Sequence, residues 1–280
     1  MALADPSPRR RWTAGPTIVG ADDLERTTPV DRTDPSGALL TRLVQVDDLV
    51  ITYAQGLVTA VNGLSLTVDA GEVLGLLGGN GAGKTSTMRA LAGITPATSG
   101  RILVAGHDLS VPADADRARQ VLGYCPDTAG VIRQGTVREH IGLALGLHGR
   151  LEDWSYALDL VTQFGLVDVL DRETTGFSHG MSRRLSVLLA ALTAQQVLIL
   201  DEPFDGVDPL GVAATEAVIR RARDAGLAVL VSTHMIDLLT KVSSRVNVLV
   251  GGRIVDEATA AQFTGDTGRS RYERLLEAAA

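Results

Sequence analysis

The 280-residue chain has little of three things: cysteine, lysine and long apolar runs. Its single cysteine, Cys125, excludes an internal disulfide and suits a reducing cytosol. Its best apolar runs, 185–200 and 227–232, are short or interrupted by polar residues, whereas a membrane helix needs about 18 consecutive apolar residues. We therefore predict no direct membrane span.

Positive charge is also scarce relative to negative charge. The formal net charge is −7 and the pI is near 5.2. Because binding to a phosphate backbone needs a basic face, no nucleic-acid partner is expected. Lys84 and Lys241 are the two lysines, and arginine supplies the other basic side chains. The length is enough to bury a full core and to form one large or two small domains.

Residues 1–40 are rich in proline, aspartate, arginine, threonine and glycine and have hardly any apolar periodicity. This composition predicts a disordered N-terminal tail. Arg9–Arg11 resembles the start of a twin-arginine signal, but polar and small residues follow Trp12 where a signal would have an apolar segment. Weak attraction to anionic lipid is the functional alternative for this tail.

Strand-like segments follow the tail. Residues 43–68 alternate apolar and polar side chains between glycine and asparagine turns, which predicts antiparallel strands, and residues 102–105 form another strand-like run. Continuous apolar runs separated by helical segments are typical of a buried parallel sheet. Three such runs occur, at 197–200, 228–232 and 246–250.

Between about 128 and 195 the pattern becomes helical. Thr136 and Glu139 have the spacing of a capping box, which predicts a helix start. A second helix is expected over about 151–164. A short C-terminal helix is expected over residues 266–280.

A glycine-rich loop follows a short apolar run that ends at Leu77. Its spacing, Gly78-x4-Gly83-Lys84-Thr85, matches the phosphate-binding P-loop. Glycines let backbone N–H groups surround phosphates, the next helix points its N-terminus the same way, and the threonine hydroxyl can hold Mg²⁺. Alone, the loop does not distinguish a GTPase, a kinase, a motor or a transporter ATPase. The expected nucleotide-binding residues are Gly78, Gly79, Asn80, Gly81, Ala82, Gly83, Lys84, Thr85 and Ser86.

Two carboxylates, Asp201 and Glu202, directly follow the apolar run 197–200. Ligands of α/β sheets bind at the C-terminal ends of such strands. One carboxylate can hold the Mg²⁺ shell while its neighbour orients or deprotonates water. Paired acids at this position can also serve as simple helix N-terminal charges, but the P-loop upstream favours the catalytic interpretation.

The order of these motifs, from residue 43 to residue 265, resembles the nucleotide-binding domain of ATP-binding cassette (ABC) transporters. The family's LSGGQ signature falls at Ser178, His179, Gly180 and Met181, and its D-loop falls at Gly206–Pro209. The resemblance implies an α/β fold: a P-loop NTPase with a RecA-like core and parallel sheet, an antiparallel β-subdomain and an α-helical signature subdomain at about 128–195. It places the ABC ATPase domain at 41–265.

The resemblance also assigns roles to single residues. Tyr53 falls where the family stacks an aromatic ring on adenine, although an ordinary strand tyrosine is the alternative. Ser178 can cap a helix whose N-terminus faces the γ-phosphate bound by the other subunit. His234 matches the switch histidine, which holds Glu202 and the attacking water in line. Lys84, Glu202 and His234 are thus the implied catalytic residues, with Ser178, Gly180, Met181 and Asp208 at the nucleotide.

Two positions depart from the family pattern. Gly79 stands where the family usually has proline. Asp127 stands where the family commonly has glutamine, and an ionised aspartate only accepts hydrogen bonds and is one methylene shorter. The resemblance implies that Thr85, Asp201 and Asp127 contribute to the Mg²⁺ site, with Asp127 acting more indirectly than glutamine. In the family, the segment that corresponds to Gly123–Asp127 also couples the ATP site to the membrane partner.

The resemblance implies an ATP-hydrolysing subunit that uses ATP and Mg²⁺, dimerises with a second ABC ATPase subunit and powers a separately encoded permease. It would act peripherally at the cytoplasmic face of the plasma membrane. Met181 followed by Arg183 and Arg184 resembles the ABC-2 exporter branch, which favours export over import. The alternatives are a soluble ABC ATPase acting on ribosomes or nucleic acid, and a weakly hydrolysing, nucleotide-gated regulatory subunit.

Overall fold

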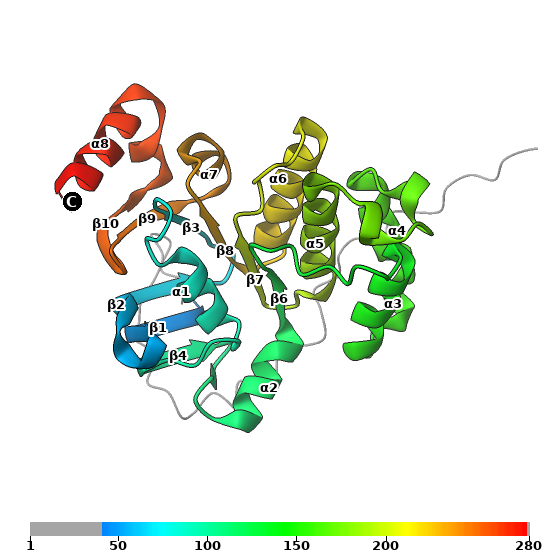
Figure 1. Cartoon of the computed structure of the whole chain (residues 1–280), viewed down its shortest axis with the longest axis horizontal. Helices are drawn as coiled ribbons and strands as arrows, with labels where there is room; N and C mark the ends of the chain where they lie inside the picture. The colour runs from blue at the N-terminus through cyan, green and yellow to red at the C-terminus, as the bar shows by residue number, and fades with distance from the viewer. Residues whose placement is uncertain (1–40, 279–280) are drawn as a thin grey trace, which may run out of the picture.

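The computed structural model describes residues 41–278, so the predictions for residues 1–40 and for the last two residues lie outside it (Figure 1). A four-stranded antiparallel sheet has the order β2-β1-β4-β5. Its two long strands pair along residues 43–68, where alternation predicted antiparallel strands, and the predicted run 102–105 falls largely in β4. The strands are β1 (Arg42–Tyr53), β2 (Val58–Asp69), β4 (Ser99–Val104) and β5 (His107–Asp108).

A second sheet has six strands in the order β10-β9-β3-β8-β7-β6, and all its neighbouring pairs except β9 and β10 are parallel. The three predicted buried strands are inner strands of this sheet, so that prediction is confirmed. The strands are β3 (Val73–Leu77), β6 (Leu122–Cys125), β7 (Val197–Asp201), β8 (Ala228–Thr233), β9 (Arg245–Val250) and β10 (Arg253–Thr259).

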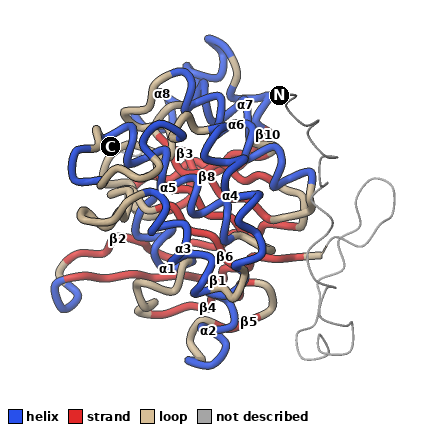
Figure 2. Tube along the Cα trace, turned by 90° about the vertical axis from the view of Figure 1, so that its right-hand side faces the viewer, coloured by secondary structure: helices blue, strands red, loops and turns tan. Residues whose placement is uncertain are grey.

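Side-chain alternation along β3 divides the core into two layers. Leu74 and Leu76 face a cluster shared with the antiparallel sheet and with α1 (Lys84–Leu91). Val73 and Leu77 face the opposite cluster, which includes α6 (Pro209–Asp224) and α7 (Ile236–Val242). The antiparallel sheet therefore covers one face of the parallel sheet, and helices cover the other (Figure 2).

Three helices form a separate bundle beside β6 and β7 (Figure 1). They are α3 (Val137–Leu147), α4 (Trp154–Gln163) and α5 (His179–Thr193). The predicted capping box begins α3: the Thr136 hydroxyl accepts from the Glu139 amide, and the Glu139 carboxylate accepts from the Thr136 amide. The predicted helix 151–164 begins as a 3-10 turn, Leu151–Asp153, before α4.

Two further α-helices complete the set in residues 41–278, which also contain short 3-10 turns at Ala54–Gly56, Val167–Val169, Thr174–Gly176 and Ala260–Phe263. α2 (Pro112–Val121), for which the sequence reading gave no prediction, leads into β6. α8 (Gly265–Ala278) follows β10 and occupies most of the segment in which a C-terminal helix is expected. Among residues 41–278, no helix is long and apolar enough to cross a membrane.

Candidate nucleotide-hydrolysing site

The P-loop connects β3 to α1, as its spacing predicts. Its glycines are required by close backbone approaches: a Cβ on Gly83 would lie 2.4 Å from the Ala60 carbonyl oxygen, and one on Gly78 would lie 2.6 Å from that of Leu249. Gly83 also has a φ of 104°, which L side chains rarely adopt. A Cβ on Gly79 would meet nothing within 4 Å, so this glycine is not required by packing. Asn80 and Gly81 are exposed at the tip of the loop.

Lys84 is buried at the start of α1, with only 6% of its surface exposed. Its ammonium donates to the carbonyl oxygens of Gly78 at 2.7 Å and Gly79 at 3.1 Å, and its Nζ lies 3.1 Å from Glu202 Oε1. An ammonium has three donors, and these three partners use them all. Phosphate oxygens entering the loop must therefore compete with the loop carbonyls and Glu202 for Lys84.

Asp201 is fully buried at the end of β7. Its Oδ1 accepts from the Ser232 hydroxyl on β8, and the Thr85 hydroxyl also bonds to the carboxylate. Burial raises the pKa of Asp201, opposed by these two hydrogen bonds and reinforced by the negative charges of Asp127 and Glu202. Its Oδ2 is buried without a hydrogen-bond partner.

An unpartnered buried carboxylate oxygen beside a threonine hydroxyl fits a divalent cation. Thr85 and Asp201 would hold it, with the half-buried Asp127 adding negative charge from the other side. Within residues 41–278, no cluster of three or more His, Cys, Asp or Glu side chains forms a metal cage. Mg²⁺ is usually bound by one or two carboxylates together with waters and substrate phosphates.

Glu202 connects Lys84 of the P-loop to His234, the predicted switch histidine. Its second oxygen, Oε2, lies 3.1 Å from His234 Nδ1, and its amide donates to the Ser232 carbonyl oxygen at 3.1 Å and to the Ser232 hydroxyl at 3.2 Å. The φ of Glu202 is 48°, a left-handed conformation that is rare for residues with a Cβ and is found in proteins mainly at functional sites. Two strand ends thus aim this carboxylate at the phosphate-binding loop.

Tyr53 lies at the end of β1, beside the P-loop helix. Its hydroxyl bonds to the Ser86 hydroxyl at 3.2 Å, and 40% of the residue is exposed. An exposed ring tethered next to the phosphate loop is suited to stack on the base of a nucleotide whose phosphates lie in that loop.

The residues predicted to form the signature lie against those predicted to form the D-loop. Ser178 caps α5 by accepting from the Met181 amide at 3.2 Å, and Asp208 caps α6 by accepting from the Gly211 amide at 2.9 Å. A Cβ on Gly180 would lie 2.6 Å from the Gly206 carbonyl oxygen. Among residues 41–278, no hydrogen bond or ion pair joins Ser178, Gly180 or Met181 to the P-loop. The residues predicted to bind nucleotide therefore lie in two separate groups in the described part of the chain.

Residues 61–205 match a family model described as ABC transporter. The chain belongs to this family. It is 32% identical over 209 residues to the lipopolysaccharide export system ATP-binding protein LptB of Escherichia coli strain K12, an alignment that covers 74% of this chain and 87% of the relative. It is 34% identical over 257 residues to the daunorubicin/doxorubicin resistance ATP-binding protein DrrA of Streptomyces peucetius, covering 85% and 76%.

Solved structures agree with the cassette fold. The ATP-binding subunit of an ABC transporter superposes with a TM-score of 0.76 at 27% identity, covering 83% of this chain and 99% of that one. A dimeric ATP-binding cassette bound to ADP and Pi superposes with a TM-score of 0.71 at 18% identity, covering 78% and 98%, and shows likeness of fold. The chain is thus an ABC-family ATPase with an ATP-binding cassette fold.

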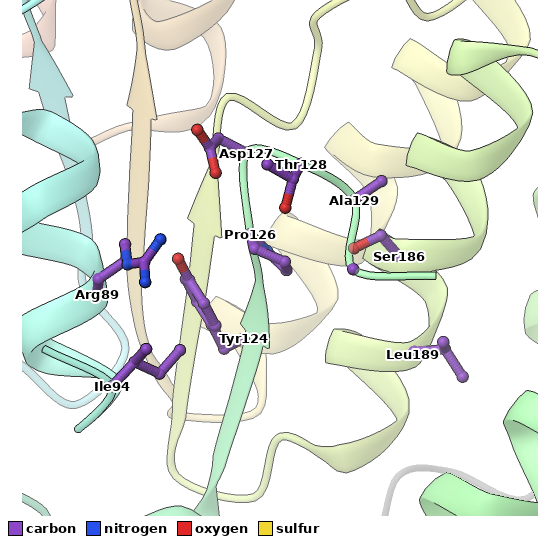
Figure 3. A pocket seen from close by; sticks show the side chains of 10 residues that line it. Arg89, Ile94, Tyr124, Pro126, Asp127, Thr128, Ala129, Ser186 and Leu189 are labelled. Atoms are coloured by element: carbon purple, nitrogen blue, oxygen red, sulfur yellow. The ribbon is translucent and has the colours of Figure 1, made fainter. Parts of the chain in front are cut away.

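Next to the ATP-binding groups, the ABC domain has a pocket of about 360 Å³ between the parallel sheet and the helical bundle (Figure 3). Arg89 from α1 and Tyr124 from β6 point toward one another at one side of it, and Asp127 lies at its rim (Figure 3). Burial raises the pKa of Tyr124, and the charges of Asp201 and Asp127 raise it further, so its hydroxyl stays protonated.

The sequence motifs assigned no role at this site to Ser232 or Arg183. Ser232 bonds to Asp201 and to the Glu202 amide. The sequence pattern that could have indicated its role is the pair of hydroxyl residues, Ser232 and Thr233, at the end of an apolar strand. Arg183 is buried among backbone carbonyls below the site. The sequence offered little indication that Arg183 is buried, because adjacent arginines on a helix usually lie in solvent.

Proposed function

We propose that this ABC ATPase hydrolyses ATP with Mg²⁺ and powers export through a separately encoded, membrane-spanning permease. One observation carries the proposal: within residues 41–278, no hydrogen bond or ion pair joins Ser178 to the P-loop, which supports a complete site that takes its signature helix from a second ABC subunit. Two chains facing each other would enclose two ATP molecules, each between one P-loop and the partner's signature helix.

The chain's own residues account for the chemistry of hydrolysis. The P-loop amides and Lys84 stabilise charge on the transferred phosphoryl group, each donor contributing on the order of 2.7–4 kcal/mol. Glu202 polarises the attacking water, which is worth roughly 10²–10⁴ in rate, and His234 fixes the orientation of its carboxylate. When bound at Thr85 and Asp201, Mg²⁺ supplies further charge neutralisation at the phosphates.

Export is the direction that the relatives favour. LptB is named for lipopolysaccharide export and DrrA for drug resistance. The Met181-containing signature, which resembles the ABC-2 exporter branch, agrees with this direction. We assign the permease contact to the pocket that Asp127 lines, because in the family this segment couples the ATP site to the membrane partner and its next residue, Thr128, is exposed. The chain would then work at the cytoplasmic face of the plasma membrane.

A regulatory subunit that binds ATP and hardly hydrolyses it is the second candidate, favoured by Asp127 at the usual glutamine position. A phosphate-release assay on the purified chain, alone and with its co-purifying membrane protein, distinguishes the two. The ATPase proposal predicts magnesium-dependent phosphate release that the membrane protein changes. Nucleotide binding without turnover in both samples would support the regulatory subunit and contradict our proposal.

A further inference from the structure

Arg183 is a buried cation in the first turns of α5. Only 1% of its surface is exposed, and within residues 41–278 it forms no ion pair. A guanidinium taken out of water without a carboxylate partner is costly unless its donors are satisfied. Its retention in this position calls for a specific set of acceptors.

Those acceptors are backbone carbonyls from the ends of two strands. Nη1 donates to Pro126 O at 2.6 Å and to Asp201 O at 3.3 Å, and Nη2 donates to Asp127 O. The planar fork of a guanidinium can hold several acceptors in fixed relative positions, whereas the point charge of a lysine cannot. One side chain on the signature helix thus joins the segment after β6 to the last residue of β7.

The helix that carries Arg183 and the carbonyls that accept from it belong to different ATP sites in the proposed dimer. Asp201 bonds to Thr85 of the chain's own P-loop, and the charge of Asp127 acts on Asp201, so both would lie at the nucleotide held by that loop. Ser178 begins the same helix as Arg183 and faces the nucleotide held by the partner. We propose that Arg183 is a positioning residue that couples the two ATP sites by moving the signature helix together with the Asp127 segment.

The competing explanation is that Arg183 only holds α5 against the sheet. A neighbouring contact, between Ser186 and Cys125, distinguishes this explanation from a coupling role. One turn further along α5, the Ser186 hydroxyl donates to Cys125 Sγ at 3.1 Å, which anchors the helix to β6 independently of Arg183. Loss of the guanidinium fork should therefore weaken the coupling between the two ATP sites while α5 stays packed against the sheet.

The substitution Arg183→Lys keeps the charge and removes the fork. The matched control is Arg150→Lys, because Arg150 donates to the Leu192 carbonyl at the far end of α5 and pairs with Asp153, away from both ATP-binding groups. We expect Arg183→Lys to lower kcat roughly 10- to 100-fold, as misplaced catalytic groups do, with KM for ATP within about twofold of wild type. The Hill coefficient for ATP should fall from above 1 in the wild type to 1.

Equal effects of the two lysine substitutions on kcat and on the Hill coefficient would overturn the proposal, as would a wild-type Hill coefficient of 1. The inference rests on the proposed function, but different results would contradict the coupling role and the proposed function. Absence of wild-type turnover removes the proposed function, whereas turnover that Arg183→Lys leaves unchanged removes the coupling role alone.

Hydrogen exchange on the wild-type chain tests the coupling even if Arg183→Lys does not fold. MgADP, added where the chain is monomeric, engages the chain's own P-loop. We expect the amide hydrogen-exchange protection of residues 127–130 and of residues 179–182 to change with added MgADP. The ADP concentration at half-maximal change should be the same for both segments. A response in 127–130 with none in 179–182 would show that Arg183 does not couple them.

Discussion

Lys84 and Glu202 form an ion pair across the nucleotide-hydrolysing site, with Nζ 3.1 Å from Oε1. The cation that should bind phosphate is thus held by the carboxylate that should act on water. Because phosphate oxygens compete for Lys84, nucleotide binding would release one oxygen of Glu202 while His234 retains the other at 3.1 Å. The active arrangement of Glu202 therefore depends on the nucleotide being in place.

Tyr53 offers a direct test of base stacking. Replacing it with alanine removes the ring, and we expect ATP to bind about 1–3 kcal/mol more weakly, which is roughly a 5- to 150-fold rise in Kd. The control Tyr53→Phe keeps the ring and loses the bond to Ser86, so its affinity should stay near that of the wild type. Equal affinities of the alanine variant and the wild type in calorimetric titrations would remove Tyr53 from the base site.

Asp201 and Ser232 should show opposite effects on stability. Asp201→Asn removes a buried charge, so the metal-free protein should unfold at a higher temperature while magnesium-dependent hydrolysis is lost. Ser232→Ala takes a hydrogen bond away from the buried carboxylate and should cost about 1–3 kcal/mol. Thermal unfolding in EDTA measures both changes. A lower midpoint for Asp201→Asn would show that its buried charge is fully compensated in the folded state.

Much of this site could be predicted because its signals are local. The P-loop glycines and the Asp201–Glu202 pair each lie within a few consecutive residues. The left-handed conformation of Glu202 and the burial of Arg183 depend on carbonyl groups distant in sequence, such as Ser232 and Pro126. No local pattern encodes such partners, so these features required the structure.

Asp127 tests how strongly this chain departs from its family. Asp127→Gln removes a negative charge near Asp201 and adds a donor, and one added hydrogen bond is worth about 0.5–1.5 kcal/mol. We expect ATP hydrolysis to rise roughly 2- to 12-fold. The control Asp159→Gln makes the same change on the exposed side of α4 and should leave hydrolysis unchanged. Unchanged turnover in Asp127→Gln would show that the position is tolerant here.

Adding a side chain at Gly206, in the predicted D-loop, should lower both stability and ATP hydrolysis. Its φ is 66°, and a Cβ there would lie 2.5 Å from Cδ2 of His179, whose Nε2 lies 3.3 Å from Asp205. Gly206→Ala should destabilise the fold by about 1–3 kcal/mol and reduce hydrolysis. Adding His179→Gly should recover part of the stability, because it relieves the contact but not the backbone strain. Additive losses in the double variant would exclude a steric contact between the two residues.

The substitution Glu202→Gln tests the central claim most directly, because it removes the proposed base while keeping the side chain's size. ATP affinity, phosphate release and dimer formation by size-exclusion chromatography are measured with MgATP. We predict wild-type ATP affinity, a roughly 10²- to 10⁴-fold fall in phosphate release and a stable ATP-bound dimer. Phosphate release at the wild-type rate, with no ATP-dependent dimer, would contradict the account.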